Sequence, residues 1–344
     1  MAEGKTAGRS AATALGGLAE TLPGLVFGYV FDEDGHATSL TRSNIAAATA
    51  ARDGWMWLHF NLADNRARDW IGNHVTLPEA AKELLLEPDD HLRLSAEDDA
   101  LIGVFADFRR ELTRGTQDLA HLKFALSGRL LVTGRRQALQ SIEDVRRALA
   151  RGEAMESGET LLEWIFDHFA DQVTAMNKEL AEKLEVIEDR VVDDQVDPAD
   201  LRVGPVRRTA LRMNRQVGAL RIHFSALVDN PERDLPDDVF AMTERVALRL
   251  TSVARDIEAI QERARIIQEE ATAKSADHMN RQLSTLSALT ALFLPATLVT
   301  GLFGMNTHGL PFDDHDQGFW IASFVALCGS GIVYVILRRL GIMK

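Results

Sequence analysis

The sequence predicts an α+β membrane protein, with a large N-terminal α/β domain, a helical subdomain and a long stalk helix that continues into the first of two C-terminal transmembrane helices. Three observations predict this class. Two long uncharged runs lie near the C-terminus, β-type runs are confined to residues 25–157, and only helical periodicity follows them. The content of 46% hydrophobic and 26% charged residues is typical of a soluble protein, so position along the chain is more informative than composition.

Residues 1–24 are expected to form a flexible tail. Lys5 and Arg9 precede a weakly apolar patch, an arrangement that superficially resembles a signal peptide. The patch is short and is interrupted by Gly16 and Gly17, so a tail is the better interpretation.

Residues 25–157 combine strand and helix patterns, which predicts a cytoplasmic α/β domain. Runs rich in branched and aromatic residues, bounded by Gly or Asp, indicate strands within 25–31, 54–62, 100–108 and 121–135. The last run contains "SGR", a hairpin turn. Helical periodicity appears in "LPEAAKELLLE", where Pro78 suits a first-turn position, and in "QSIEDVRRALA".

Residues 158–236 predict a cytoplasmic helical subdomain. Apolar residues recur at threes and fours from 159 to 193, which indicates an amphipathic helix of about 50 Å. The sequence "DPADL" at 197–201 breaks this helix, a second helix follows to about Leu227, and "DNPERDLPDD" breaks the chain again.

Residues 237–303 predict one continuous helix that serves as the stalk and the first transmembrane segment. From Asp237 onward no proline occurs before Pro295 and no glycine before Gly301, which gives a helix of about 100 Å. Its last 21 residues, Leu283–Phe303, carry no charge. They cover about 31 Å, the thickness of a bilayer core.

A second uncharged run at 319–337 predicts the second transmembrane helix, with an outer loop at 304–318 before it and a basic tail at 338–344 after it. Basic residues flank the two runs and are absent from the loop: Lys274, Arg281, Arg338, Arg339 and Lys344. The positive-inside rule therefore predicts that both chain termini are cytoplasmic. The alternative, two core helices of a soluble protein, is disfavoured because uncharged runs of this length are rare there.

A stripe of polar and apolar residues follows one face of the first span and predicts a pore lining. Steps of three and four residues give Asn280, Leu283, Ser287, Thr290, Leu294, Thr297 and Gly301. Polar groups on one face of a membrane helix usually face protein or water, although helix packing by Ser and Thr explains the same pattern. Two spans cannot enclose a water-filled path alone, so conduction requires several copies.

The stripe ends at Gly304, Met305 and Asn306, and an acidic loop follows. Repeated around a symmetry axis, the Asn306 amide can present a ring of acceptors to a hydrated cation, but Asn equally suits a helix C-cap. The loop can attract cations, or it can be a solvated connector. Its candidate residues are His308, Asp313, Asp314, His315 and Asp316.

Residue content excludes several classes of function. The net charge of −13 argues against a nucleic-acid partner, and the single Cys328 excludes an intrachain disulfide or a thiolate zinc cluster. No closed metal site is expected, because Leu283–Phe303 lacks His, Cys, Asp and Glu, and the His–Asp neighbours in "PDDH" (88–91) and "DHFAD" (167–171) are too few. With no phosphate loop and no nucleophile–base pair, neither an ATP-driven pump nor an enzyme is expected, and no cofactor is expected.

The "GMN" at 304–306, at the end of the penultimate span and followed by a second span and a short basic tail, resembles the CorA family of divalent cation transporters. The stretch "GMNTHGLP" is more similar to the zinc-transporter branch, ZntB, and departs from it at His308, where the branch has Gly. The matching residues are Gly304, Met305, Asn306, Gly309 and Pro311. The resemblance covers the whole architecture, from the α/β domain to the second span.

The resemblance implies a funnel-shaped homopentamer, multi-pass in the bacterial inner membrane, with the first span lining the pore and the "GMN" ring selecting hydrated cations. By offset from the motif, Asn280, Leu294 and Thr297 match the family's pore lining. The implied function is zinc uptake coupled to the proton gradient, with Co²⁺, Ni²⁺ and Cd²⁺ as further ions; the alternative is a magnesium or cobalt channel of the parent family. Expected partners are further copies of the chain, the lipid bilayer, divalent cations and protons. A membrane-tethered scaffold whose long helices bind partners is a third hypothesis.

Overall fold

The computed structural model describes residues 23–41, 54–109, 119–192, 202–230, 235–305 and 318–341. The chain divides into two units, Met1–Glu185 with Gly204–Ala264, and Val186–Val203 with Arg265–Lys344. Residues 1–22 of the expected tail lie outside the described residues, as do 342–344 of the basic tail.

A seven-stranded mixed sheet forms the centre of the first unit, with the strand order β2-β1-β3-β7-β6-β5-β4. Its only parallel pair among the described residues is β3 with β7. Residues Gly128 and Arg129 connect β6 to β7 as the predicted hairpin turn, and Gly128 has a positive φ of 52°. The strands are β1 (Leu25–Phe31), β2 (Ala37–Ser39), β3 (Trp55–Asn61), β4 (Arg93–Glu97), β5 (Ala100–Phe108), β6 (Leu119–Ser127) and β7 (Leu130–Arg135).

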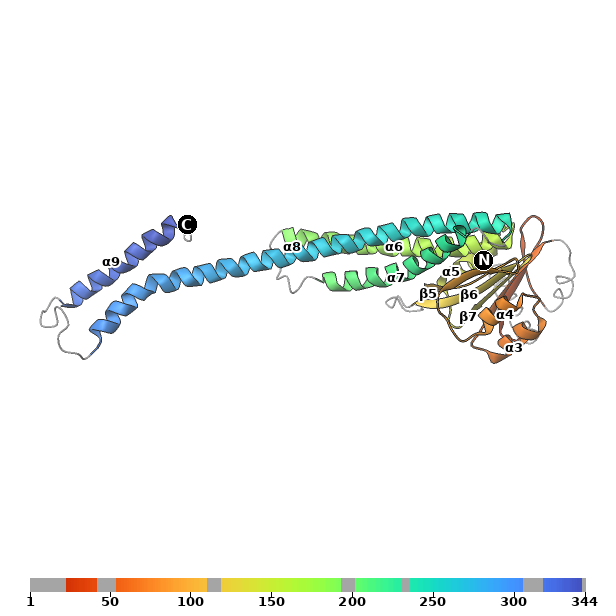
Figure 1. Ribbon diagram of the computed structural model, residues 1–344, viewed down its shortest axis with the longest axis horizontal. Coiled ribbons are helices and arrows are strands. Elements are labelled where there is room, and N and C mark those ends of the chain that lie inside the picture. The colour runs from red at the N-terminus through yellow and green to blue at the C-terminus, as the bar shows by residue number, and fades with distance from the viewer. Residues whose placement is uncertain are drawn as a thin grey trace, which may run out of the picture. The chain divides into compact units, whose positions relative to one another are not determined.

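One face of the sheet is covered by α3 (Asn65–His74) and α4 (Glu79–Leu86) (Figure 1). Helix α3 begins at Asp64, whose carboxylate accepts a hydrogen bond from the backbone N–H of Arg66 at 2.9 Å. The apolar side chains of both helices share one core with alternate residues of the strands: Leu58, Phe60, Ile71, Leu84, Leu85, Ile102, Val104, Ala125 and Val132. Helix α4 is one of the two helices predicted from periodicity in this region.

The other face of the sheet packs against α5 (Gln140–Ala150) and α6 (Gly158–Val192). Phe105 of β5 lies 4.5 Å from Phe166 of α6, measured between ring centroids. Phe166 in turn meets Phe224 of α7 (Val203–Val228) edge to face at 4.9 Å. The aromatic rings therefore join the sheet to the helical part.

Helices α6 and α7 and the first part of α8 (Asp237–Phe303) lie side by side (Figure 1). Arg245 of α8 donates two hydrogen bonds to Glu163 of α6, at 2.7 and 2.6 Å, and Gln261 donates to the carbonyl oxygen of Ala210 in α7 at 3.1 Å. The ion pair is half-exposed and contributes less than about 1 kcal/mol. Burial of apolar residues is the larger contribution: Val173, Leu180, Leu184, Val217, Leu220, Leu250 and Ile257.

The second unit contains the remainder of α8, the end of α6 and α9 (Gly318–Arg339). The Lys274 ammonium donates to the carbonyl oxygens of Val191 at 2.6 Å and Val192 at 3.1 Å, which satisfies acceptors at the end of α6. Among the described residues two helices, α8 and α9, are long and apolar enough to cross a membrane, and only 6% of each apolar window is buried inside the chain. Core helices of a soluble protein would be mostly buried, so this exposure favours the membrane interpretation. Helix α8 covers the expected range 237–303, and α9 begins one residue before and ends two residues after the expected 319–337.

Candidate functional site

The stripe predicted from periodicity lies on an exposed face of α8. Leu283 is 55% and Leu294 is 66% exposed, so the described residues of the chain leave much of both side chains uncovered. The other members, Asn280, Ser287, Thr290, Thr297 and Gly301, are exposed as well. This face is therefore free to meet another copy, lipid or water.

A different face of the same span packs against α9. Ser330 Oγ donates a hydrogen bond to the carbonyl oxygen of Leu292 at 2.9 Å, and a Cβ placed on Gly329 would lie 3.0 Å from Cβ of Pro295. Ala288, one turn before Leu292, is buried. At 3.6 residues per turn, these positions point away from the stripe that contains Thr290, Leu294 and Thr297. Contact with α9 therefore leaves the predicted lining uncovered.

The threonine hydroxyls of the stripe donate to the backbone of their own helix. Thr290 Oγ1 donates to the carbonyl oxygen of Leu286, and Thr297 Oγ1 to that of Phe293, each at 2.9 Å. A hydroxyl that has donated its only proton keeps its lone pairs as acceptors. The stripe therefore offers acceptors suited to water molecules around a cation, and it offers no charged ligand.

The span ends at the first two residues of the motif. Gly304 N–H donates to the carbonyl oxygen of Thr300 at 2.9 Å, and Met305 N–H donates to that of Leu302 at 3.4 Å. A Cβ on Gly304 would lie 2.9 Å from the carbonyl oxygen of Thr300, so a side chain at this position would clash with the last helical turn. Asn306 lies outside the described residues, so both of its interpretations, amide ring and C-cap, stay predictions. The same holds for the loop residues His308, Asp313, Asp314, His315 and Asp316.

A family model described as CorA-like Mg2+ transporter protein matches residues 52–339, most of the chain. The chain belongs to the CorA family. Membership confirms the resemblance seen in the "GMN" and in the order of the segments. It also makes the chain a divalent cation transporter and not an enzyme.

Relatives and solved structures agree with this assignment over most of the chain. The divalent cation transporter CmaX of Pseudomonas aeruginosa is 25% identical over 92% of this chain and 96% of its own, and its full-length structure superposes with a TM-score of 0.75 over 92% of this chain and 98% of that one. The zinc transport protein ZntB of Yersinia enterocolitica is 27% identical over 86% and 88%. The CorA magnesium transporter of Methanocaldococcus jannaschii, 15% identical, has the same fold, with a TM-score of 0.74 over 92% and 99%.

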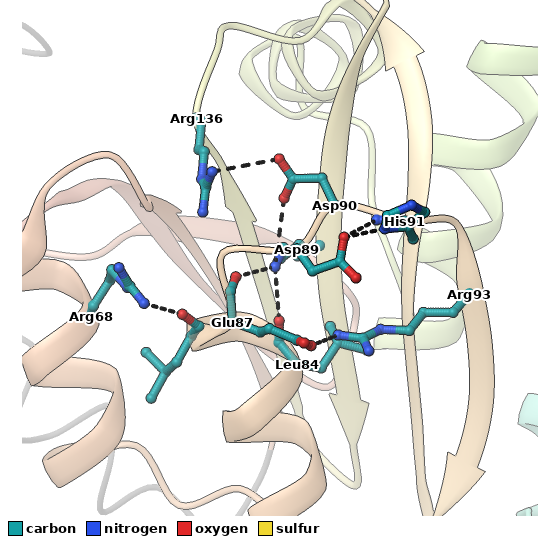
Figure 2. Close-up of polar contacts among 10 residues, drawn as sticks. Arg68, Leu84, Glu87, Asp89, Asp90, His91, Arg93 and Arg136 are labelled. Carbon is teal, nitrogen blue, oxygen red and sulfur yellow. Dashed lines mark hydrogen bonds and ion pairs between the residues drawn. The ribbon is translucent and has the colours of Figure 1, made fainter.

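The "PDDH" segment of this CorA-family chain forms a polar joint between α4 and the sheet (Figure 2). The side chain of Lys123, 2% exposed on β6, donates to the carbonyl oxygens of Leu84 at 3.0 Å and Glu87 at 2.6 Å and lies 3.6 Å from the Asp90 carboxylate. Burial lowers the pKa of Lys123, and Asp90 opposes that shift. His91 pairs with Asp89, and the hydrogen bonds of Lys123 hold the end of α4.

Periodicity alone overlooks Lys123. The signal that identifies it is a lysine in the middle of the apolar run "HLKFALS", where a charge must find partners. Arg136, 3.7 Å from Asp90, completes the joint at its exposed side. No group of three His, Cys, Asp or Glu side chains placed to hold a metal occurs among the residues that the structure describes.

The "DHFAD" segment is equally occupied by contacts within the CorA-family chain. His168 Nδ1 lies 2.8 Å from the carbonyl oxygen of Trp164, one turn earlier on α6. Asp171 accepts a hydrogen bond from Arg249 of α8 at 2.6 Å. Burial raises the pKa of Asp167, and the neighbouring Glu163 carboxylate adds to that shift. The segment therefore contributes to helix packing.

Asp107 is a second buried charge that the sequence pattern does not reveal. Its carboxylate accepts hydrogen bonds from Ser141 Oγ at 2.7 Å, from the Ser141 N–H at 3.1 Å and from the Phe108 N–H at 2.8 Å. It thereby joins β5 to the first turn of α5, and Gln172 of α6 donates to Ser141 Oγ at 3.2 Å. Burial outweighs these hydrogen bonds and raises the pKa of Asp107 to about 7.

Proposed function

We propose that this protein is a zinc transporter of the bacterial inner membrane that works as a homopentamer, with α8 of each copy lining a central pore. The observation that carries the proposal is the uncharged stripe of α8, which is exposed, faces away from α9 and ends at Gly304 and Met305. A water-filled path needs several such stripes facing one axis. The number five and the funnel shape come from the resemblance to the family.

Hydrated ions fit this lining better than ions stripped of water. Leu283–Phe303 contains no His, Cys, Asp or Glu, so the span lacks the ligands that would trap a dehydrated zinc ion. Hydroxyl acceptors at Thr290 and Thr297 can hold the waters of a passing cation weakly enough for release. The proposed role of Asn306 is a ring of amide acceptors at the end of this path, and that of His308 and the loop aspartates is to concentrate cations there.

We propose zinc rather than magnesium as the transported ion because of the names of the relatives and the resemblance of the motif to the zinc branch. Relatives named zinc transport protein reach 27% identity, and the Gly and Pro positions of "GMNTHGLP" carry the resemblance to the zinc branch. Co²⁺, Ni²⁺ and Cd²⁺ are further candidate ions. A magnesium or cobalt channel is the second candidate, favoured by the description of the matching family.

Basic residues support an orientation with both termini in the cytoplasm. Lys274 and Arg281 precede the first span and Arg338 and Arg339 close the second, whereas the loop between the spans has neither Lys nor Arg. An acidic outer loop that gathers cations suits uptake. Coupling to the proton gradient is proposed from the resemblance; it would need a path outside the spans, since neither contains a carboxylate.

An ion panel on the purified full-length protein in proteoliposomes tests the proposal. Zn²⁺ and Mg²⁺ influx are measured with and without an inward proton gradient, and we expect saturable zinc influx that the gradient accelerates. Asn306→Ala should reduce it at least tenfold, while Asn73→Ala, the same change in the exposed part of α3, should leave it unchanged. Magnesium flux without zinc flux would establish the second candidate. A pentamer whose Asn306→Ala variant keeps full ion flux would contradict the pore, and a protein without any flux would favour the scaffold hypothesis.

A further inference from the structure

The first span contains a proline at a position where its backbone needs outside support. Pro295 has no N–H, so the carbonyl oxygen four residues earlier, Ala291, receives no helical hydrogen bond, and the ring crowds the preceding turn. Within a bilayer no water can satisfy carbonyls that such a turn exposes. Side chains of a neighbouring helix then become the available donors.

Helix α9 supplies both a donor and a fitted surface at this turn. Ser330 Oγ donates at 2.9 Å to the carbonyl oxygen of Leu292, which is the residue after Ala291 and belongs to the same turn that the proline ring crowds. Gly329, the adjacent residue, faces the proline ring, and a Cβ there would lie 3.0 Å from Pro295 Cβ. That separation is shorter than an ordinary van der Waals contact, so an alanine at this position would push the two helices apart by a few tenths of an ångström.

The turn at Pro295 sets the position of the residues that end the pore stripe. Helix α8 changes direction in its last, blue part (Figure 1), as helices do at proline. Gly304 lies nine residues beyond Pro295, or about 13 Å along a helix. A change of about 10° in the bend therefore moves Gly304 sideways by about 2 Å. In a symmetric pore every copy would move, so the opening would change by about twice that distance.

We propose that Ser330, with Gly329, is a positioning residue that fixes the bend of the pore-lining span at Pro295 and so sets the width of the selective end of the pore. The proposal rests on the proposed function, since it takes α8 as the pore lining. Neither residue lies on the exposed stripe, so both would act through the backbone of α8. Simple packing by small residues is the alternative, and it assigns no role to the hydroxyl.

Conservative variants separate the effect of the Ser330 hydroxyl from the effect of packing between the two helices. Ser330→Ala removes the donor, Ser330→Thr keeps it, and Gly329→Ala adds a methyl group against the proline ring. Ser323→Ala is the matched control: it lies two helical turns earlier on α9, on the same face, and among the described residues has no hydrogen bond to α8. Proteoliposome influx of Zn²⁺ and Mg²⁺ is measured for each variant. Ser330→Ala should change the Zn²⁺ to Mg²⁺ flux ratio at least threefold with the pentamer intact, Ser330→Thr should restore it to within twofold, and Ser323→Ala should match the unmodified protein.

A distance measurement gives a readout that does not depend on transport. Spin labels at Leu302→Cys and Leu327→Cys, both exposed, are placed on the same chain in a Cys328→Ser background and diluted with unlabelled copies. Ser330→Ala should shift the mean distance by about 2 Å or broaden its distribution, and Ser330→Thr should not. An unchanged distance and an unchanged flux ratio in Ser330→Ala would overturn the proposal. A changed distance in a protein that transports neither ion would support the positioning role and reject the proposed function.

Discussion

The buried carboxyl group of Asp107 predicts that its contribution to the stability of this protein falls as the pH rises from about 4 to about 7. Its pKa is about 7 in the folded state, against 3.8 for an ordinary aspartate. Between pH 3.8 and pH 7, the folded state therefore keeps a proton on Asp107 that the unfolded state has released. A raised folded-state pKa contributes stability that is fully present below pH 3.8 and is lost as the pH rises towards 7.

The size of the effect follows from the two pKa values. A separation of about 3 units corresponds to about 4 kcal/mol in the free energy of unfolding over the whole range. Between pH 5 and pH 8 the linkage relation gives about 2 to 3 kcal/mol of this loss. Asp107→Asn replaces the acid by a neutral group of the same shape. The variant should lose this share of the pH dependence, at a constant cost of about 1 kcal/mol, because its amide N–H₂ would oppose the N–H of Ser141.

Urea unfolding of the full-length protein in detergent, followed by tryptophan fluorescence at pH 5 to 8, measures the difference. The unfolding free energy of the unmodified protein should drop by about 2 to 3 kcal/mol more than that of Asp107→Asn across this range. Asp69→Asn, an exposed position on α3, serves as the control and should keep the unmodified profile. An Asp107→Asn variant with the same pH slope as the unmodified protein would refute the reasoning.

Two further predictions concern a buried lysine and the pore stripe. Lys123→Met should lower the free energy of unfolding by about 2 to 4 kcal/mol, because two buried carbonyl oxygens lose their donor and Asp90 keeps only Arg136 as a cationic partner. The same urea titration measures this loss, and a value below about 1 kcal/mol would contradict the structural role. Thr297→Val keeps the side-chain shape but removes an acceptor from the stripe, so zinc influx into proteoliposomes should fall at least threefold with the pentamer intact. Thr300→Val, whose hydroxyl lies off the stripe, is its control, and equal influx in both variants would argue against the lining.

Local sequence patterns were sufficient to predict most of the helices. Helix α5 occupies Gln140–Ala150, the range whose periodicity predicts it, and α8 occupies Asp237–Phe303 because neither glycine nor an early proline interrupts it. The turn at Gly128 follows from its residue type as well. These features depend on residues a few positions apart, which a single sequence displays directly.

Nonlocal features could not be predicted in the same way. The short strands β2 and β4 and the parallel pairing of β3 with β7 depend on partners far along the chain. Lys123 and Asp107 lie within apolar strand runs, where an alternating pattern assigns a charge to the exposed side. Both are buried because the ends of α4 and α5 supply partners, and these helices lie more than 30 residues away. Helical spacing predicted that the stripe shares one face of α8, but not that α9 packs on another face, and its role as a pore lining stays a prediction.

Under the proposed function, the chemistry of the stripe also limits which part of the pore can discriminate between zinc and magnesium. Removing the water from a divalent cation costs far more free energy than a lining of hydroxyl and apolar groups can compensate. The ions would therefore pass hydrated, and hydrated zinc and magnesium differ little in size and charge. In this chain a group that can replace some of the water on zinc would add discrimination, and histidine is a residue type suited to it. His308, two residues after Asn306, is the nearest histidine to the "GMN" and the position at which the chain departs from the zinc branch. We therefore expect His308→Gly to change the ratio of zinc to magnesium flux while total flux is kept.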